Sequence, residues 1–316
     1  MNKFSLLIKN YKTVLVIIVL AGITMAAIWW LFISLKPYTI SQAKINDIYQ
    51  QHASYTPDIN FSEIKQGQYK ITFTSYDGES VEGRLELPSN KTLEQWLTEK
   101  KTNEVDIFFG VSAMGRNYLR WWQDSFKGRP TITQVDKIGQ MALSSNHMLV
   151  AIDARYHGTR KIETLPLSKI MNNLNIWGER NYYEQMIVDT VMDYRHLING
   201  LSKKYSKANI TVAGYSMGAQ VSIILGAMDS RVDKVLSIVP PNLDNKVALV
   251  APINFVGLLN LEKIWLLTAE ADEYAGEKQN LILFEGIESE NKHHISFDSD
   301  HILPENYTDS LVAWFD

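Results

Sequence analysis

The hydrophobic and polar positions of the chain divide it into two parts. Residues 14–35 are uninterrupted by charge, whereas later residues alternate short apolar runs with amphipathic stretches. At ~1.5 Å per residue, a helix over 14–35 would span about 33 Å, enough to cross the core of a bilayer. Such a helix would be apolar on every face, which is not typical of a helix on a globular core. The pattern therefore predicts one N-terminal transmembrane helix followed by a folded domain.

Charges flanking the apolar run favour one orientation. Three lysines precede the apolar run and two follow it: Lys3, Lys9 and Lys12 come before, and Lys36 and Lys44 come after. The positive-inside rule then places residues 1–13 in the cytoplasm and the folded domain outside it, on the periplasmic or extracellular side. A cleavable signal peptide is the alternative, but its apolar region is usually shorter and leads into a polar mature start. We therefore expect a retained, single-pass anchor.

Residues 36–67 are polar and contain one short helical pattern. Ser41 is a suitable cap for a helix over 41–52. We expect this segment to be a linker that spaces the membrane anchor from a domain spanning 68–316.

From residue 68 onward, strand-like apolar runs alternate with helix-like amphipathic runs. This alternation predicts a mostly parallel sheet covered by helices on both faces. The first two strands are expected to form an antiparallel hairpin around Tyr76-Asp77-Gly78. The predicted strands include 68–74, 80–87, 105–109, 147–153, 235–239, 263–268 and 293–297, and the predicted helices include 131–144, 181–201 and 305–315.

Composition narrows the chemistry that the domain can perform. The 316 residues are 46% hydrophobic and 21% charged, which is an ordinary globular balance. A net charge of −4 gives no sign of nucleic-acid binding. The chain has no cysteine, which excludes disulfides, a thiol nucleophile and cysteine-based zinc or iron–sulfur sites.

One pentapeptide, Gly214-Tyr215-Ser216-Met217-Gly218, carries the strongest chemical signal. It reads Gly-x-Ser-x-Gly and lies between an apolar run at 210–213 and a helical run at 219–228. This strand–turn–helix context is typical of a nucleophile elbow, which presents a serine hydroxyl above the sheet edge. The two glycines would remove side chains that otherwise collide with the neighbouring strand and helix.

A serine nucleophile needs a base and an acid that orients the base. Asp272 follows the strand 263–268, and His301 lies in the loop between the last strand and the last helix. The chain order Ser216, Asp272, His301 matches the order expected for this kind of triad. Nearby acids and histidines remain alternatives on sequence alone: Glu270, Glu273, His293 and His294.

These motifs together resemble the α/β-hydrolase superfamily, in its esterase and dienelactone-hydrolase-like branch, over 68–316. The resemblance implies an α/β fold with a mostly parallel eight-stranded sheet and helices on both faces. The segment 149–160 resembles the strand and Asp-x-Arg-x-x-Gly loop of that branch. By this resemblance Asp153, Arg155 and His157 are structural residues.

The segment expected to form the oxyanion hole departs from the pattern of the superfamily at one residue. Members of the superfamily usually carry His-Gly after the third strand, and here Phe109 occupies the histidine position before Gly110. Because the donors are backbone groups, the change need not remove them. The N–H groups of Met217 and Val111 are the predicted donors, with Ser112 as an alternative to Val111.

The sequence thus predicts a serine hydrolase, carboxylesterase-like, in which Ser216 attacks an ester or related acyl bond. Its expected partners are a small-molecule or lipid-like acyl substrate and the membrane; no cofactor or metal is implied. A serine peptidase, a thioesterase, a lipase and a non-catalytic binding scaffold on the same fold are the alternatives. Two insertions, 113–128 and 161–180, carry apolar and aromatic residues that are expected to shape the pocket.

Overall fold

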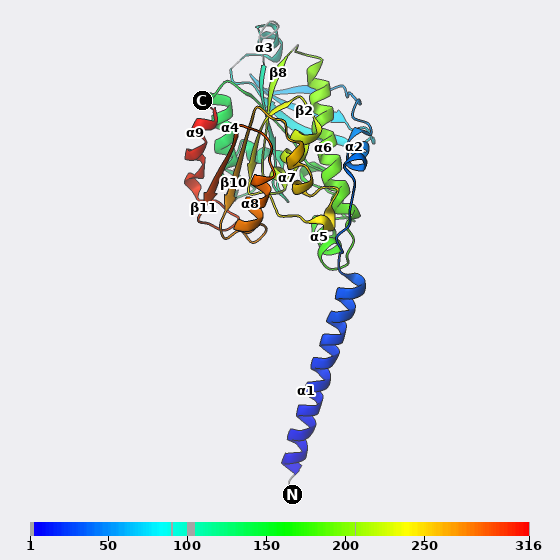
Figure 1. Cartoon of the computed structure of the whole chain (residues 1–316). Coiled ribbons are helices and arrows are strands. Elements are labelled where there is room, and N and C mark those ends of the chain that lie inside the picture. Colours follow the sequence, from blue (N-terminus) through cyan, green and yellow to red (C-terminus); the bar gives the residue numbers. More distant parts are fainter. Residues whose placement is uncertain (1–2, 90, 100–104, 206, 316) are drawn as a thin grey trace.

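A twisted mixed sheet forms the centre of the domain (Figure 1). The computed structural model describes residues 3–89, 91–99, 105–205 and 207–315. Within these residues the sheet has nine strands in the order β1-β2-β3-β7-β4-β8-β9-β10-β11. Their bounds are β1 Asn60–Lys65, β2 Gln68–Thr74, β3 Ser80–Glu86, β4 Val105–Val111, β7 Met148–Ile152, β8 Ala208–Tyr215, β9 Val232–Ile238, β10 Lys263–Ala269 and β11 Lys292–Phe297; a separate hairpin is formed by β5 Ser125–Phe126 and β6 Arg129–Pro130.

The strand directions combine an antiparallel start with a parallel remainder. β1, β2, β3 and β7 pair antiparallel in succession, and every later pair, from β7–β4 to β10–β11, is parallel. The predicted hairpin and the mostly parallel sheet are therefore confirmed. The expected number of eight strands is wrong, because β1 adds a ninth at the edge. β1 comes from the segment expected to be a linker, and Gly67, at φ +78°, lies in the turn that leads from it into β2.

Helices cover both faces of the sheet, as Figure 1 shows. Strand β4 shows why helices are needed on both faces. Its neighbouring residues Phe109 and Phe108 point to opposite faces, and each belongs to a different apolar core. Helices α6, α7 and α8 pack on the first core, whereas α4 and α9 pack on the second. The helices are α1 Lys3–Ile28, α2 Gln42–Gln50, α3 Leu93–Glu99, α4 Val135–Ser144, α5 Leu167–Asn175, α6 Asn181–Ser202, α7 Met217–Met228, α8 Glu277–Glu285 and α9 Val312–Phe315.

Residues 36–59 are packed on the domain, which differs from the linker expected for 36–67. Ser41 caps α2, as predicted, through a hydrogen bond from the N–H of Lys44 to its side chain. Ile45 and Tyr49 of α2 are fully buried, and Arg195 of α6 donates to the carbonyl of Tyr49. The mostly polar sequence gives little sign of these contacts, because the nine residues of α2 bury only Ile45 and Tyr49.

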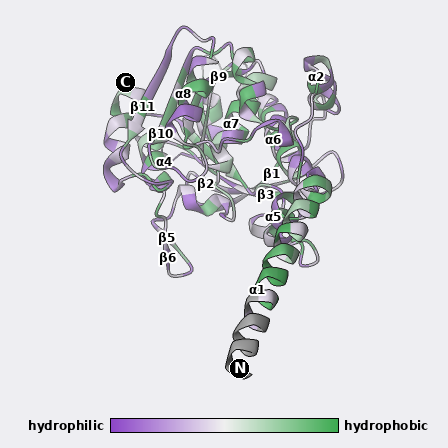
Figure 2. Ribbon diagram, turned by 60° about the horizontal axis from the view of Figure 1, so that its bottom comes forward, coloured by the Kyte–Doolittle hydropathy of each residue, from purple (hydrophilic) through white to green (hydrophobic). Residues whose placement is uncertain are grey.

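The apolar N-terminal segment is a helix that projects from the domain (Figure 1). α1 continues into a π-helical turn, Trp29–Ile33, and Thr13–Ile33 is long and apolar enough to cross a membrane. Figure 2 shows the hydrophobic colouring of the part of α1 nearest the domain, where it approaches α5. An exposed apolar surface of this length is typical of a membrane-spanning helix or of a signal sequence.

Candidate active site

Ser216 lies in a sharp turn between β8 and α7. Its φ is +56° and its ψ is −118°, a strained conformation for a residue with a side chain. A Cβ on Gly214 would lie 2.1 Å from the carbonyl of Gly218, and one on Gly218 would lie 2.2 Å from the carbonyl oxygen of Val111. Both glycines are therefore required by close backbone contacts, as the sequence predicted.

The structure brings Ser216, His301 and Asp272 into one hydrogen-bonded chain. The Oγ of Ser216 lies 2.8 Å from Nε2 of His301, and Nδ1 of His301 lies 3.0 and 2.9 Å from the two carboxylate oxygens of Asp272. An ionised carboxylate only accepts, so Nδ1 carries the proton. Nε2 of a neutral ring is then the acceptor that faces the serine hydroxyl.

The competing acids have other positions. Glu273 accepts a hydrogen bond from the backbone N–H of His301, at 3.3 Å, and not from its imidazole. Glu270 is exposed. Asp272 is buried and also accepts from the N–H of Tyr274, at 2.8 Å, which fixes its carboxylate beneath the imidazole.

The competing histidines lie along β11 and away from the serine. The ring of His294 is 2.8 Å from the hydroxyl of Thr268, and burial lowers its pKa. His293 is exposed and its ring contacts Trp265. The geometry therefore selects His301 as the partner of Ser216.

The predicted oxyanion donors flank Ser216. Met217 is the first residue of α7, where the N–H groups of the first turn have no partner within the helix. Val111 is the last residue of β4, in register with Gly214, and the two strands hold it beside the elbow. The hydroxyl of Ser112 donates to the carbonyl of Asn117, 3.0 Å away, so its side chain is already used.

A pocket of about 520 Å³ opens over Ser216, and we call it the Ser216 pocket. Both predicted insertions contribute to its wall: the first through Ala113, Met114 and Arg116, the second through α5. His301 and Arg116 are the basic residues of its lining. The full lining is Ala113, Met114, Arg116, Thr133, Met171, Leu174, Asn175, Tyr183, Tyr215, Ser216, Met217, Pro241, Leu243, Tyr274, His301 and Ile302. A mostly apolar wall around the Ser216 hydroxyl suits the acyl or alcohol part of an ester.

Two tyrosines support the histidine and were not predicted. The hydroxyl of Tyr215 donates to the carbonyl of His301, at 2.8 Å, and accepts from the N–H of Leu303, at 3.0 Å. The ring of Tyr274 lies edge-on to the imidazole, 4.7 Å away between centroids. Tyr215 occupies a variable position of the Gly-x-Ser-x-Gly pattern, so the motif gives no signal for this role.

The loop 153–160 is a structural core beside the site. Asp153 accepts from the N–H groups of Tyr118 and Thr159, at 3.1 and 2.8 Å. Gly158 leaves no room for a side chain, since its Cβ would lie within 2.2 Å of the Asp153 carboxylate. This geometry fits the structural role that the resemblance implied for Asp153.

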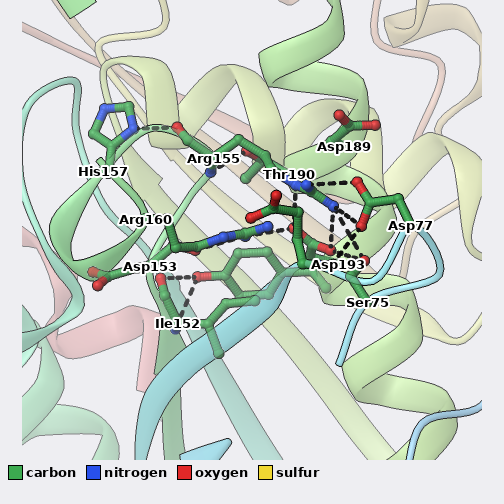
Figure 3. Close-up of polar contacts among 12 residues, drawn as sticks. Ser75, Asp77, Ile152, Asp153, Arg155, His157, Arg160, Asp189, Thr190 and Asp193 are labelled. Carbon is green, nitrogen blue, oxygen red and sulfur yellow. Dashed lines mark hydrogen bonds and ion pairs between the residues drawn. The ribbon is translucent and has the colours of Figure 1, made fainter. Parts of the chain in front are cut away.

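Arg155 and Arg160 converge on one buried carboxylate, as Figure 3 shows. Oδ2 of Asp193 lies 3.1 Å from Nε of Arg155 and 2.6 Å from Nη1 of Arg160. Asp77 adds a second partner to Arg155, at 2.7 Å. Burial alone would lower the pKa of Arg155, but the carboxylates of Asp193 and Asp77 reverse this and raise it.

His157 is fully buried and does not reach Ser216. Its Nδ1 lies 2.6 Å from the carbonyl of Arg155, within the same loop. Burial lowers the pKa of His157 to about 4. Its position agrees with the structural role expected from the resemblance. Among the described residues, no group of three or more His, Asp or Glu side chains could hold a metal ion.

Comparison with solved structures identifies the fold. An acetyl xylan esterase from Paenibacillus sp. R4 matches with a TM-score of 0.62 at 12% identity, over 89% of this chain and 96% of that chain. Acetyl xylan esterase 1 from Thermoanaerobacterium sp. JW/SL YS485 matches with a TM-score of 0.58 at 14% identity, over 88% and 98%. The esterase Pf2001 from Pyrococcus furiosus matches with a TM-score of 0.54 at 12% identity, over 89% and 93%.

These similarities are structural and distant. No protein-family model matches the chain, and no curated protein matches it. At 12–14% identity the matches show a shared fold, which fits the α/β-hydrolase fold that the sequence resemblance implied.

Proposed function

We propose that the protein is a serine hydrolase of the esterase type, with Ser216 as nucleophile. The observation that carries this proposal is the unbroken hydrogen-bonded chain from Ser216 through His301 to Asp272 at the floor of the Ser216 pocket. The esterase fold of its structural neighbours is consistent with the same chemistry. A binding scaffold would have no need of a strained serine aligned with a histidine and a buried acid.

The proposed reaction proceeds through an acyl-enzyme. Nε2 of His301 takes the proton of Ser216 as Oγ attacks the ester carbonyl, and the imidazolium then protonates the departing alcohol. Asp272 holds the ring in the required tautomer and stabilises its charged form. Water, deprotonated by the same histidine, attacks the acyl-enzyme carbonyl; the bond from that carbon to Oγ breaks, the imidazolium returns the proton to Ser216, and the water oxygen leaves in the carboxylic acid product.

Backbone donors are proposed to stabilise the negative charge on the carbonyl oxygen. The N–H of Met217 is the first candidate because it stands at the N-terminus of α7, where partial positive charge gathers. The N–H of Val111 is the second. Each donor of this kind is typically worth about 3–4 kcal/mol of transition-state stabilisation.

We further propose that residues 14–35 are a retained single-pass anchor that places the domain outside the cytoplasm. Contacts between the end of this helix and the domain support retention. The indole N–H of Trp29 donates to the carbonyl of Ile176, at 2.6 Å. Gly178, at φ +68°, admits the backbone of Ile33, since a Cβ there would lie 1.9 Å from the Ile33 carbonyl oxygen. Cleavage as a signal peptide would remove both contacts.

The test is covalent labelling of the full-length protein with a fluorophosphonate, alongside hydrolysis of nitrophenyl butyrate. We expect the wild type to be labelled and active, and Ser216→Ala to fold, resist labelling and lose activity. Asp272→Asn should be labelled slowly, whereas Glu270→Gln should behave as the wild type. A folded wild type that neither reacts with the probe nor hydrolyses any ester would contradict the proposal and favour a binding scaffold.

A further inference from the structure

A second hollow adjoins the Ser216 pocket, and we call it the anchor groove. It has a volume of about 480 Å³ and shares three lining residues with the Ser216 pocket: Leu174, Asn175 and Leu243. The two hollows therefore meet at the end of α5. The full lining of the anchor groove is Trp29, Trp30, Ser34, Leu35, Lys36, Pro37, Leu174, Asn175, Asn242, Leu243, Asp244, Lys246 and Val247.

The other side of the anchor groove is formed by the end of the apolar helix. Trp29 and Trp30 belong to the last turn of the segment that is long and apolar enough to span a membrane. Figures 1 and 2 both show α5 beside this end of the helix. The hydrogen bond from Trp29 to Ile176 and the contact of Ile33 with Gly178 fix the helix end against the residues that follow α5. With the helix in a bilayer, the anchor groove would lie at the membrane surface, where tryptophan side chains concentrate.

The charged residues of the anchor groove are already engaged. The Nζ of Lys36 donates to the carbonyl of Trp30 and to the hydroxyl of Ser34, and its ammonium lies over the Trp30 ring. The Nζ of Lys246 lies 3.5 Å from the carboxylate of Asp244. Apart from Asn175 and Asn242, the side chains that remain are indole, leucine, proline and valine groups, which suit an alkyl chain better than a polar ligand.

We infer that the substrate is a membrane-resident ester whose long acyl chain enters the Ser216 pocket along the anchor groove. The inference rests on the proposed ester hydrolysis and on the proposed anchor. Because the two hollows share lining residues at the end of α5, an ester carbonyl at Ser216 would have its acyl chain directed toward Trp29 and Leu35. A chain leaving the bilayer would then stay in contact with apolar side chains along its path, which limits the cost of exposing it to water.

The experiment uses the full-length protein reconstituted in phosphatidylcholine vesicles. Hydrolysis of nitrophenyl palmitate dissolved in the vesicle membrane is compared with hydrolysis of water-soluble nitrophenyl butyrate. Leu35→Glu puts a carboxylate into the anchor groove outside the Ser216 pocket, and Leu35→Trp fills the same space without charge. Ile64→Glu adds the same charge at a distant site and is the control for that charge, because Ile64 is an exposed residue of the edge strand β1.

We expect Leu35→Glu to lower the rate on vesicle-bound palmitate about tenfold or more, since an alkyl chain would have to desolvate the carboxylate. Leu35→Trp should act in the same direction, so the ratio of the palmitate rate to the butyrate rate should fall in both Leu35 variants and stay at the wild-type value in Ile64→Glu. Wild-type rates on palmitate in both Leu35 variants would overturn the inference. So would a wild type that hydrolyses butyrate but not vesicle-bound palmitate. Absence of activity on both esters, together with absence of fluorophosphonate labelling, would instead contradict the proposed function and the inference with it.

Discussion

The hydroxyl of Tyr215 is hydrogen-bonded to the backbone carbonyl of His301, at 2.8 Å, although the residues are 86 positions apart. Tyr215 directly precedes Ser216, so one side chain joins the serine turn to the histidine loop. The same hydroxyl receives the N–H of Leu303 and is buried, and burial raises the pKa of Tyr215. The distance between Ser216 and His301 thus depends on a residue that touches neither reacting atom.

Tyr215→Phe should loosen this link without removing any proposed catalytic group. Loss of the hydroxyl leaves the buried N–H of Leu303 unpaired, which typically costs about 1–3 kcal/mol of folding free energy. We expect kcat on nitrophenyl butyrate to fall about tenfold or more, because small misplacements of a catalytic base are costly, while KM stays nearly constant.

Tyr307→Phe is the matched control for that prediction. Tyr307 is buried in the same core and its hydroxyl donates to the carbonyl of Thr133, at 2.7 Å. The control should lose comparable stability in urea unfolding and keep its kcat. Equal loss of kcat in both variants would show that Tyr215 acts only through general stability.

Gly214→Ala should prevent the turn from forming. The added Cβ would meet backbone atoms of Gly218 at 2.1 Å, and backbone cannot move aside as a flexible side chain can. We expect destabilisation of about 3 kcal/mol or more, at the upper end for overpacking, and loss of fluorophosphonate labelling. Gly257→Ala, where nothing lies closer than 3.9 Å, is the control and should retain both. A labelled, stable Gly214→Ala protein would show that the turn can relax.

The positions of Ser216, Asp272 and His301 could be predicted from sequence because each follows a strand. The carboxyl ends of parallel strands meet at one edge of a sheet, so residues far apart in the chain become neighbours there. Local apolar runs are strong enough to locate strands at 263–269 and 292–297 within a residue or two. The sequence could not separate Asp272 from Glu273. The two residues are adjacent, and only the direction of each side chain decides which carboxylate reaches the His301 imidazole.

The packing of residues 36–59 and the ninth strand could not be predicted. α2 buries only Ile45 and Tyr49, and β1 exposes most of its side chains, so neither shows a clear apolar period. Their stability comes from partners distant in sequence, such as the contact of Tyr49 with Phe255. Tertiary contacts of this kind override a polar local pattern.

Asp193→Asn should destabilise the domain strongly. The Asp193 side chain is only 1% exposed and pairs with Arg155 and Arg160, so its loss leaves two buried guanidinium groups with less compensating charge. Breaking such a buried pair typically costs about 3–5 kcal/mol. Asp47→Asn removes an exposed pair with Lys44 and should change the free energy of unfolding by less than about 0.5 kcal/mol. Urea unfolding of both variants measures the difference.

The free energy of unfolding should decrease as the pH is lowered, and His157 is one cause of that decrease. Its pKa is about 4 in the folded protein, below the ordinary 6.5, because burial disfavours the charged ring. The unfolded state therefore binds the proton more tightly than the folded state does. The contribution of His157 to the free energy of unfolding is complete above pH 6.5 and is lost as pH falls toward 4. The total is about 3 kcal/mol at most. His157→Asn should flatten the change in unfolding free energy between pH 6.5 and 4, whereas His293→Asn, at an exposed site, should not. An unchanged slope in His157→Asn would refute this account.

Two N-terminal truncations should separate the anchor from the fold. A fragment spanning 36–316 loses the contacts of Trp29 and Ile33 with the turn after α5, but it keeps α2. We expect it to be water-soluble, to unfold cooperatively and to hydrolyse nitrophenyl butyrate. Its rate on vesicle-bound palmitate should fall, because the anchor groove loses the two tryptophans.

A fragment spanning 60–316 should behave differently, although it removes only 24 further residues. It loses Ile45 and Tyr49, which are fully buried, and each such side chain contributes about 1.5–3 kcal/mol. A loss of about 3–6 kcal/mol is comparable with the whole stability of a marginal domain. It also removes two backbone carbonyls that α6 uses. Arg195 donates to the carbonyl of Tyr49, and Nε2 of His196 is hydrogen-bonded to the carbonyl of His52. We therefore expect this fragment to aggregate or to unfold at much lower urea concentration. Equal stability of the two fragments would show that residues 36–59 contribute nothing to the fold and act as a linker.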